Sequence, residues 1–203
     1  MSLSAGMSPS AASTPVRDRH EPINPLDGRA LRQCLSRFST GVTVVSYEVD
    51  GEPRGATMNA FTSVSLDPPL ILLSVARTAR ACDALEQTPF AVNILRANQR
   101  DVALQFAGRP QRGAALTWRR DTGRAPALAG TVAVLQCRPW ARYDGGDHVL
   151  QLGEVIEARH EPGEPLLFVG GDFSTAGLPL YDTPRVLDNW VDQARHLHDI
   201  AGA

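Results

Sequence analysis

The most regular hydrophobic patterns in this chain are short and have the period of β-strands. Apolar and polar residues roughly alternate over residues 56–66, as in a strand with one face toward solvent or a ligand. Asp67-Pro68-Pro69 interrupts this pattern, because proline has no N–H to donate and restricts the residue before it. Residues 71–75 then form a continuous apolar strand. The hydroxyl and amide side chains of the first segment either face water, as polar strand residues often do, or form a binding surface.

Further strands are predicted at residues 42–48, 90–95, 131–142, 148–159 and 166–169. Asp-Gly turns lie at residues 50–53 and 144–147, so each is expected to join two antiparallel strands. Residues 107–128 contain glycine, proline and several arginines, which favours a long surface excursion. Long loops of this kind often carry binding or catalytic residues rather than serving only as connections.

Helical spacing is found in four other segments. The first helix is predicted to begin at Asp27, as the cap, and to carry an apolar face through Phe38. Short helices are predicted after Thr78 and Asn98, each of which could serve as a cap. A terminal helix with an apolar stripe is predicted within residues 183–197.

Six or seven short strands with a few helices between them indicate a closed or nearly closed antiparallel barrel. The strands do not alternate with helices as βαβ units do, and no GxGxxG motif follows a strand. The sequence therefore argues against a Rossmann site for a dinucleotide.

Composition narrows the classes of function. The 203 residues suit one domain, and the net charge of −2 offers no footprint for nucleic acid. The chain has no lysine, so a lysine nucleophile or Schiff base is excluded. Three scattered cysteines without a CxxC pair are typical of reduced thiols in a cytosolic protein. No histidine and carboxylate pattern predicts a metal site.

The two ends of the chain differ from its middle. Residues 1–24 are rich in serine, alanine and proline, and we expect a flexible arm, followed by one domain at residues 25–180 and a helical segment at residues 181–203. No apolar run is long enough to span a membrane, and the N-terminus lacks the pattern of a secretory signal. We therefore expect a cytoplasmic protein with no membrane partner.

Four blocks in order carry a resemblance to a known family. Residues 38–42, 58–70 and 90–95 and the motif Gly146-Asp147-His148 resemble the flavin reductase-like family over residues 31–173. The resemblance implies a mainly β fold with flanking helices, the Greek-key split β-barrel of the FMN-binding type. It also implies an NAD(P)H:flavin oxidoreductase, with NADH favoured over NADPH, that reduces FAD or FMN for a partner monooxygenase. A homodimer with the flavin near the subunit interface is expected.

The same resemblance assigns the flavin site to two segments, the polar strand and the turn after the next strand. Short hydroxyl and amide groups suit the pyrimidine edge of a flavin, and arginines at a helix start suit a phosphate. Relatives typically carry hydroxyl residues where alanines stand in this turn, so a weakly held, exchangeable flavin would follow. The flavin-binding residues are predicted to be Asn59, Ala60, Phe61, Thr62, Ser63, Ser65, Arg77, Thr78, Ala79, Arg80, Asn93 and Gln99.

Asn93 allows two interpretations, because it lies within an apolar run. A buried amide without partners would cost about 1–3 kcal/mol, so it is either bonded to nearby backbone or turned toward the ligand. The resemblance favours the ligand.

For the nicotinamide nucleotide, the resemblance favours His148, with Asp147 fixing its tautomer or the turn. Gly171 and Phe173 are assigned to the same site. No side chain is expected to act as a catalytic acid or base, because hydride transfer between two stacked rings needs orientation and electrostatics. Two alternatives stay open: a flavoprotein that retains FMN and oxidises or oxygenates an organic substrate itself, and a barrel that binds flavin without turnover.

Overall fold

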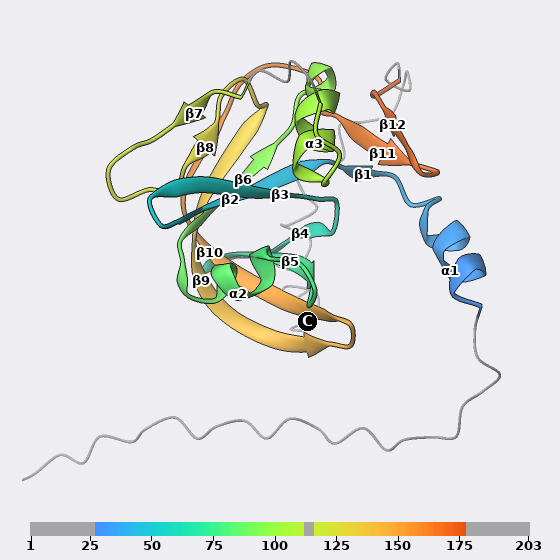
Figure 1. Ribbon diagram of the computed structural model, residues 1–203, viewed down its shortest axis with the longest axis horizontal. Coiled ribbons are helices and arrows are strands. Elements are labelled where there is room, and N and C mark those ends of the chain that lie inside the picture. Colours follow the sequence, from blue (N-terminus) through green and yellow to red (C-terminus); the bar gives the residue numbers. More distant parts are fainter. Residues whose placement is uncertain (1–26, 112–115, 178–203) are drawn as a thin grey trace, which may run out of the picture.

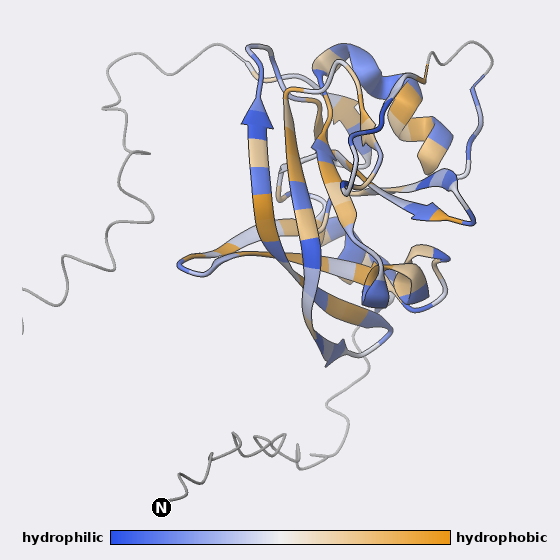
Figure 2. Ribbon diagram, turned by 90° about the vertical axis from the view of Figure 1, so that its left-hand side faces the viewer, coloured by the Kyte–Doolittle hydropathy of each residue, from blue (hydrophilic) through white to orange (hydrophobic). Residues whose placement is uncertain are grey.

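In the computed structural model, which describes residues 27–111 and 116–177, the central element is a seven-stranded antiparallel sheet (Figure 1). Its strands, in spatial order, are β3 (Glu52–Met58), β2 (Thr43–Val49), β6 (Phe90–Ile94), β9 (Ala133–Gly145), β10 (His148–His160), β5 (Pro69–Ala76) and β4 (Phe61–Leu66). The long strands carry alternating hydrophobic and hydrophilic bands (Figure 2). This is the period expected when one face of a strand is buried and the other is not.

The sheet curls back on itself because its two edge strands are consecutive in the chain (Figure 1). Only Asn59 and Ala60 separate β3 from β4. Within the described residues no ladder pairs these two strands, so the barrel is open along this line. The fold class predicted from the sequence, mainly β with flanking helices, is confirmed.

The other elements surround this barrel. They comprise α1 (Gly28–Leu35), α2 (Ala81–Gln87), the 3-10 helix η1 (Ala97–Gln99), α3 (Arg100–Phe106), and two small sheets formed by β1 (Thr40–Gly41), β11 (Leu167–Val169) and β12 (Asp172–Ser174), and by β7 (Trp118–Arg119) and β8 (Ala127–Leu128). None of these helices has the length and hydropathy needed to cross a bilayer.

Two clusters of buried side chains form most of the core. The larger lies inside the barrel around Leu73, Leu85 and Phe90, and α2 covers it through contacts with β2, β5, β9 and β10. The second cluster, around Val44 and Leu95, is covered by α3 and by the aromatic residues of β11 and β12. Burial of these side chains supplies most of the driving force for folding.

Local signals placed several elements correctly. Asp27 caps α1, and its carboxylate accepts a hydrogen bond of 2.9 Å from the Arg29 N–H. Asp50 and Gly51 have φ angles of 53° and 76°, the left-handed pair that a two-residue hairpin turn requires. The predicted hairpin of residues 131–142 and 148–159 is β9 and β10, which pair along their full length.

Other expectations were wrong in detail. The polar strand breaks at Asn59 and Ala60 into β3 and β4. Thr78 and Asn98 do not cap helices: α2 begins after Arg80, and Asn98 lies inside η1, with Gln99 preceding α3. The strands β1, β7, β8 and β12 were not predicted, because two or three residues carry too little periodicity to recognise. The predicted arm and terminal helix lie outside the described residues.

Candidate functional site

Two adjoining pockets lie beside the line where the barrel is open. The smaller, about 220 Å³, is bounded by Asn59 and Ala60, by the end of β5 and by His148. The larger, about 560 Å³, extends from the same wall over β2 and β3 to α3. Ala56 and Ala79 line both pockets, so the two form one continuous groove. Five of the residues predicted for the site, Asn59, Ala60, Ala79, Arg80 and His148, line this groove.

His148 is held by the turn that joins β9 to β10. Its Nδ1 lies 2.7 Å from a carboxylate oxygen of Asp147. Because that carboxylate accepts, a neutral His148 carries its proton on Nδ1 and leaves Nε2 free. The hydrogen bond from His148 holds the pKa of Asp147 below its usual range. This geometry agrees with the predicted role of Asp147 in setting the tautomer.

Arg77 also holds this turn. Its Nε donates to the Gly146 carbonyl at 2.8 Å, and its terminal nitrogen pairs with Asp144. The Gly146 N–H, followed by the Arg77 guanidinium, lowers the pKa of Asp144. The backbone N–H of Arg77 also donates to Asp147 at 3.0 Å. Two of the three guanidinium nitrogens are thus bound to the hairpin, so Arg77 holds this turn, and the phosphate role predicted for it stays a prediction.

The remaining predicted residues of the polar strand follow the exposed edge of the barrel. Thr62 and Ser63 are exposed on β4 and lie outside both pockets. The Ser65 hydroxyl accepts a hydrogen bond of 3.2 Å from Asp67. Phe61 packs against the barrel core. These four residues and Thr78 therefore border the groove without lining it in the single chain.

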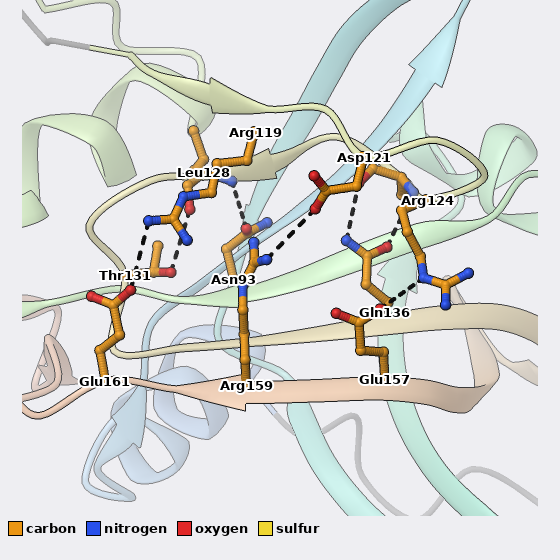
Figure 3. Close-up of polar contacts among 11 residues, drawn as sticks. Asn93, Arg119, Asp121, Arg124, Leu128, Thr131, Gln136, Glu157, Arg159 and Glu161 are labelled. Carbon is orange, nitrogen blue, oxygen red and sulfur yellow. Dashed lines mark hydrogen bonds and ion pairs between the residues drawn. The ribbon is translucent and has the colours of Figure 1, made fainter.

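Asn93 is a structural residue, so its predicted contact with a ligand is corrected. Its side chain is fully buried, and its amide donates at 2.8 Å to the carbonyl of Val44 and to the hydroxyl of Ser46. Its oxygen accepts from the N–H of Leu128 at 2.8 Å (Figure 3). Every group of this amide is satisfied by the protein. The alternative stated above, bonding to nearby backbone, is the one observed.

Gln99 is also occupied within the protein. Its oxygen accepts from the Arg96 N–H at 2.9 Å, and its nitrogen donates to the Ala129 carbonyl at 3.1 Å. It lines neither pocket of the groove. The predicted flavin contact of Gln99 is therefore replaced by a role in closing the turn before α3.

Gly171 and Phe173 lie in a different part of the chain from His148. They belong to the β11–β12 hairpin, at the end of the barrel opposite the β9–β10 turn in Figure 1. Phe173 stacks edge to face on Phe168, with ring centroids 5.5 Å apart. Within one described chain, these residues do not come together with His148.

The larger pocket contains residues that sequence reasoning missed. Arg54 of β3 lies in it together with Arg80, Tyr47, Gln105 and Phe106. Burial raises the pKa of the Tyr47 phenol, and the charges of Arg54 and Arg80 offset part of this effect. Both guanidiniums therefore lie near the phenol. The proximity of Arg54 to Tyr47 follows from the register of β2 and β3, which places these two residues opposite each other. No short segment of the sequence contains this information.

The later part of the excursion, residues 118–128, is anchored to the outside of the barrel by ion pairs, whereas Gly108 near its start lines the larger pocket. Asp121 and Arg124 pair with Arg159 and Glu157 at 3.7 and 2.8 Å (Figure 3). A cavity under this segment measures only about 10 Å³, enough for a water molecule at most. The groove is therefore the better ligand site.

The comparisons with known proteins agree with this geometry. The family model described as the Flavin reductase like domain matches residues 35–177. The chain belongs to the flavin reductase-like family. It is 40% identical over 148 residues to the FMN reductase (NADH) SmoA of Agrobacterium fabrum, covering 72% of this chain and 85% of that protein. It is 43% identical over 141 residues to the reductase component of 4-hydroxyphenylacetate 3-monooxygenase of Thermus thermophilus, covering 68% and 90%.

A solved structure confirms the expected split-barrel type of fold in this flavin reductase-like chain. The NADH:FAD oxidoreductase of Streptomyces globisporus, in complex with NAD and FAD fragments, superposes with a TM-score of 0.70 at 41% identity. The match covers 80% of this chain and all of that one.

The groove of this family member has the lining that a flavin requires. Its combined size falls within the range of small-molecule sites. Alanines at positions 56, 60, 76 and 79 contribute only methyl groups to the lining, which leaves room for a ring system. Asn59, Ser74 and His148 supply polar groups around it. The donor set and the small side chains are therefore compatible in chemistry and size with a flavin.

Proposed function

We propose that this chain is an NADH:flavin oxidoreductase that takes FAD or FMN as an exchangeable substrate and supplies the reduced flavin to a separate monooxygenase component. The observation that supports this most directly is the smaller pocket, where Asn59 and Ala60 lie on one side and the tautomer-fixed His148 on another. The names of the relatives, which include an NADH-dependent FMN reductase and a monooxygenase reductase component, support the same activity.

A bound flavin would supply the acceptor for hydride from the nicotinamide, and the chain's residues would supply position. Asn59 and the backbone around Ala60 would bind the polar edge of the ring. His148, with its proton on Nδ1, would accept a hydrogen bond through Nε2 from the nicotinamide nucleotide, while Arg77 keeps the turn in place. No protein acid or base is required in this scheme.

The proposed enzyme acts as a homodimer. The apolar residues Leu31 and Leu35 of α1 and Phe38, which follows the helix, support this, because they are 41%, 62% and 78% exposed in the single chain. An apolar face of this kind on a folded domain is typical of a protein interface. Phe38→Ser should shift the species measured by light scattering from dimer toward monomer, whereas Val49→Ser, an exposed apolar residue elsewhere, should not. A wild-type monomer at micromolar concentration would remove the dimer from the proposal.

The activity is tested by NADH consumption of the purified protein with and without added FAD or FMN. Consumption that requires added flavin and saturates with its concentration supports an exchangeable substrate. Consumption by a yellow protein indifferent to added flavin would instead support the alternative of a retained FMN. No consumption with either flavin would support a non-catalytic flavin-binding barrel.

The role of His148 has its own test. His148→Ala should raise the KM for NADH about 5- to 10-fold, because one neutral hydrogen bond contributes about 1 kcal/mol, and should change the KM for flavin less. His160→Ala, at the exposed far end of the same strand, is the matched control. Equal effects on both substrates would remove His148 from the nucleotide site.

A further inference from the structure

Two arginines in the larger pocket have no acidic partner among the described residues. Arg54 comes from β3 and Arg80 from the turn before α2, yet both line the same space of about 560 Å³. Most other arginines on the barrel form ion pairs, as Arg77 does with Asp144 and Arg142 with Glu86. Two uncompensated guanidiniums that face one groove from different elements form an electropositive site.

We propose that Arg54 and Arg80 bind the diphosphate of FAD and thereby make this reductase select FAD over FMN. The inference rests on the proposed function, because it assigns the flavin ring to the smaller pocket. Arginine forms bidentate, charge-assisted hydrogen bonds with phosphate oxygens. One guanidinium for each of two adjacent phosphates matches a diphosphate, whereas the single phosphate of FMN needs only one.

The rest of the larger pocket suits the adenosine that follows the diphosphate. Phe106 offers an aromatic surface on which an adenine could pack, and Gln105 offers an amide for its polar edge. Phe106 is itself fixed by edge-to-face contact with Trp118, at a centroid distance of 5.8 Å. Ala79 lines both pockets, so only a methyl group stands at this point of their shared wall. FMN has no group that would fill this space.

NADH also contains an adenosine diphosphate, so the larger pocket could take this part of either FAD or NADH. The positions of Arg80 and His148 decide between the two. Arg80 lies in the turn that borders the flavin pocket through Ala79. His148, the residue proposed for NADH, lines the smaller pocket but not the larger one. This arrangement favours FAD as the occupant of the larger pocket.

The test measures the Kd of FAD and of FMN by quenching of flavin fluorescence, together with the KM for NADH. The wild type should bind FAD at least about 10-fold more tightly than FMN. Arg54→Gln and Arg80→Gln should each weaken FAD binding about 10-fold or more, the effect expected on losing a hydrogen bond to a charged group. Because FMN carries a single phosphate, at most one of the two variants should weaken FMN binding comparably, and the other should change it less than about 3-fold. Arg138→Gln, on the outer face of β9, is the matched control.

The outcomes separate the alternatives. Equal weakening of FAD and FMN by both variants, or no weakening of FAD by either, would overturn the diphosphate subsite. An unchanged Kd for FAD with a raised KM for NADH would assign the pocket to NADH and overturn the selection of FAD. If FAD binds selectively through both arginines but NADH is not consumed, the subsite stands and the proposed reductase activity fails. Both arginines are exposed, and thermal unfolding will verify that the variants fold.

Discussion

Replacing Asn93 by leucine tests whether this residue supports the fold or binds the ligand. Leucine has a similar branched shape but cannot form any of the amide's hydrogen bonds. The substitution would leave the Leu128 N–H without the acceptor that it now has at 2.8 Å. It would also remove donors from the Val44 carbonyl and the Ser46 hydroxyl. All of these groups lie in the interior, where water cannot replace the lost partner.

The expected loss of stability follows from these contacts. An unsatisfied buried donor costs about 1–3 kcal/mol, and each further hydrogen bond that is lost costs about 0.5–1.5 kcal/mol. The free energy of unfolding should therefore fall by about 2–5 kcal/mol. For a chain of this size, a loss of about 3 kcal/mol lowers the Tm by about 6–12 °C. The segment around Leu128 should exchange its amide hydrogens faster, because Asn93 is what holds it to β6 (Figure 3).

Urea unfolding gives the change in stability, and the Kd for FAD measured on folded protein gives any change in binding. We expect Asn93→Leu to be destabilised and to bind FAD with nearly unchanged affinity. Asn98→Leu is the matched control, since Asn98 is exposed in η1 and should lose little stability. If Asn93→Leu unfolds at the same urea concentration as the wild type and binds FAD more than about 10-fold more weakly, the structural role assigned here is refuted.

Two further predictions concern the β9–β10 hairpin. A Cβ at Gly153 would lie 2.5 Å from the ring of Phe90, so Gly153→Ala should lower the free energy of unfolding by about 1–3 kcal/mol through overpacking. Gly41→Ala, where nothing lies within 4 Å of the added Cβ, is its control, and equal stabilities of the two variants would contradict the packing argument. Asp144 has a lowered pKa, chiefly through the Gly146 N–H, so its contribution to stability exists above the unfolded pKa and is lost as the pH falls through the folded one. Asp144→Asn should therefore be less stable than the wild type at neutral pH and equal to it in strong acid, and unfolding curves that differ by the same amount at every pH would disprove this coupling.

The sequence by itself determined the features that depend on neighbouring residues. The alternation of apolar and polar positions located the long strands, and the Asp50-Gly51 pair located a turn whose φ angles only a few residue types adopt. Asp27 marked the start of α1. The family resemblance added the expected fold and named Asn59, Ala60 and His148, which the structure brings to one pocket. Each of these signals is contained in a few consecutive residues or in a recurring motif.

Only the tertiary structure decided what the isolated polar residues contact. Arg77 and Arg80 stand three positions apart in one turn, yet the first binds a hairpin 69 residues away and the second lines an open pocket. Asn93 follows the same rule, because its partners come from β2 and from the segment before β9. The partner of a polar side chain depends on which strands lie beside it and in which register, and these long-range pairings are not encoded in any short window of the sequence.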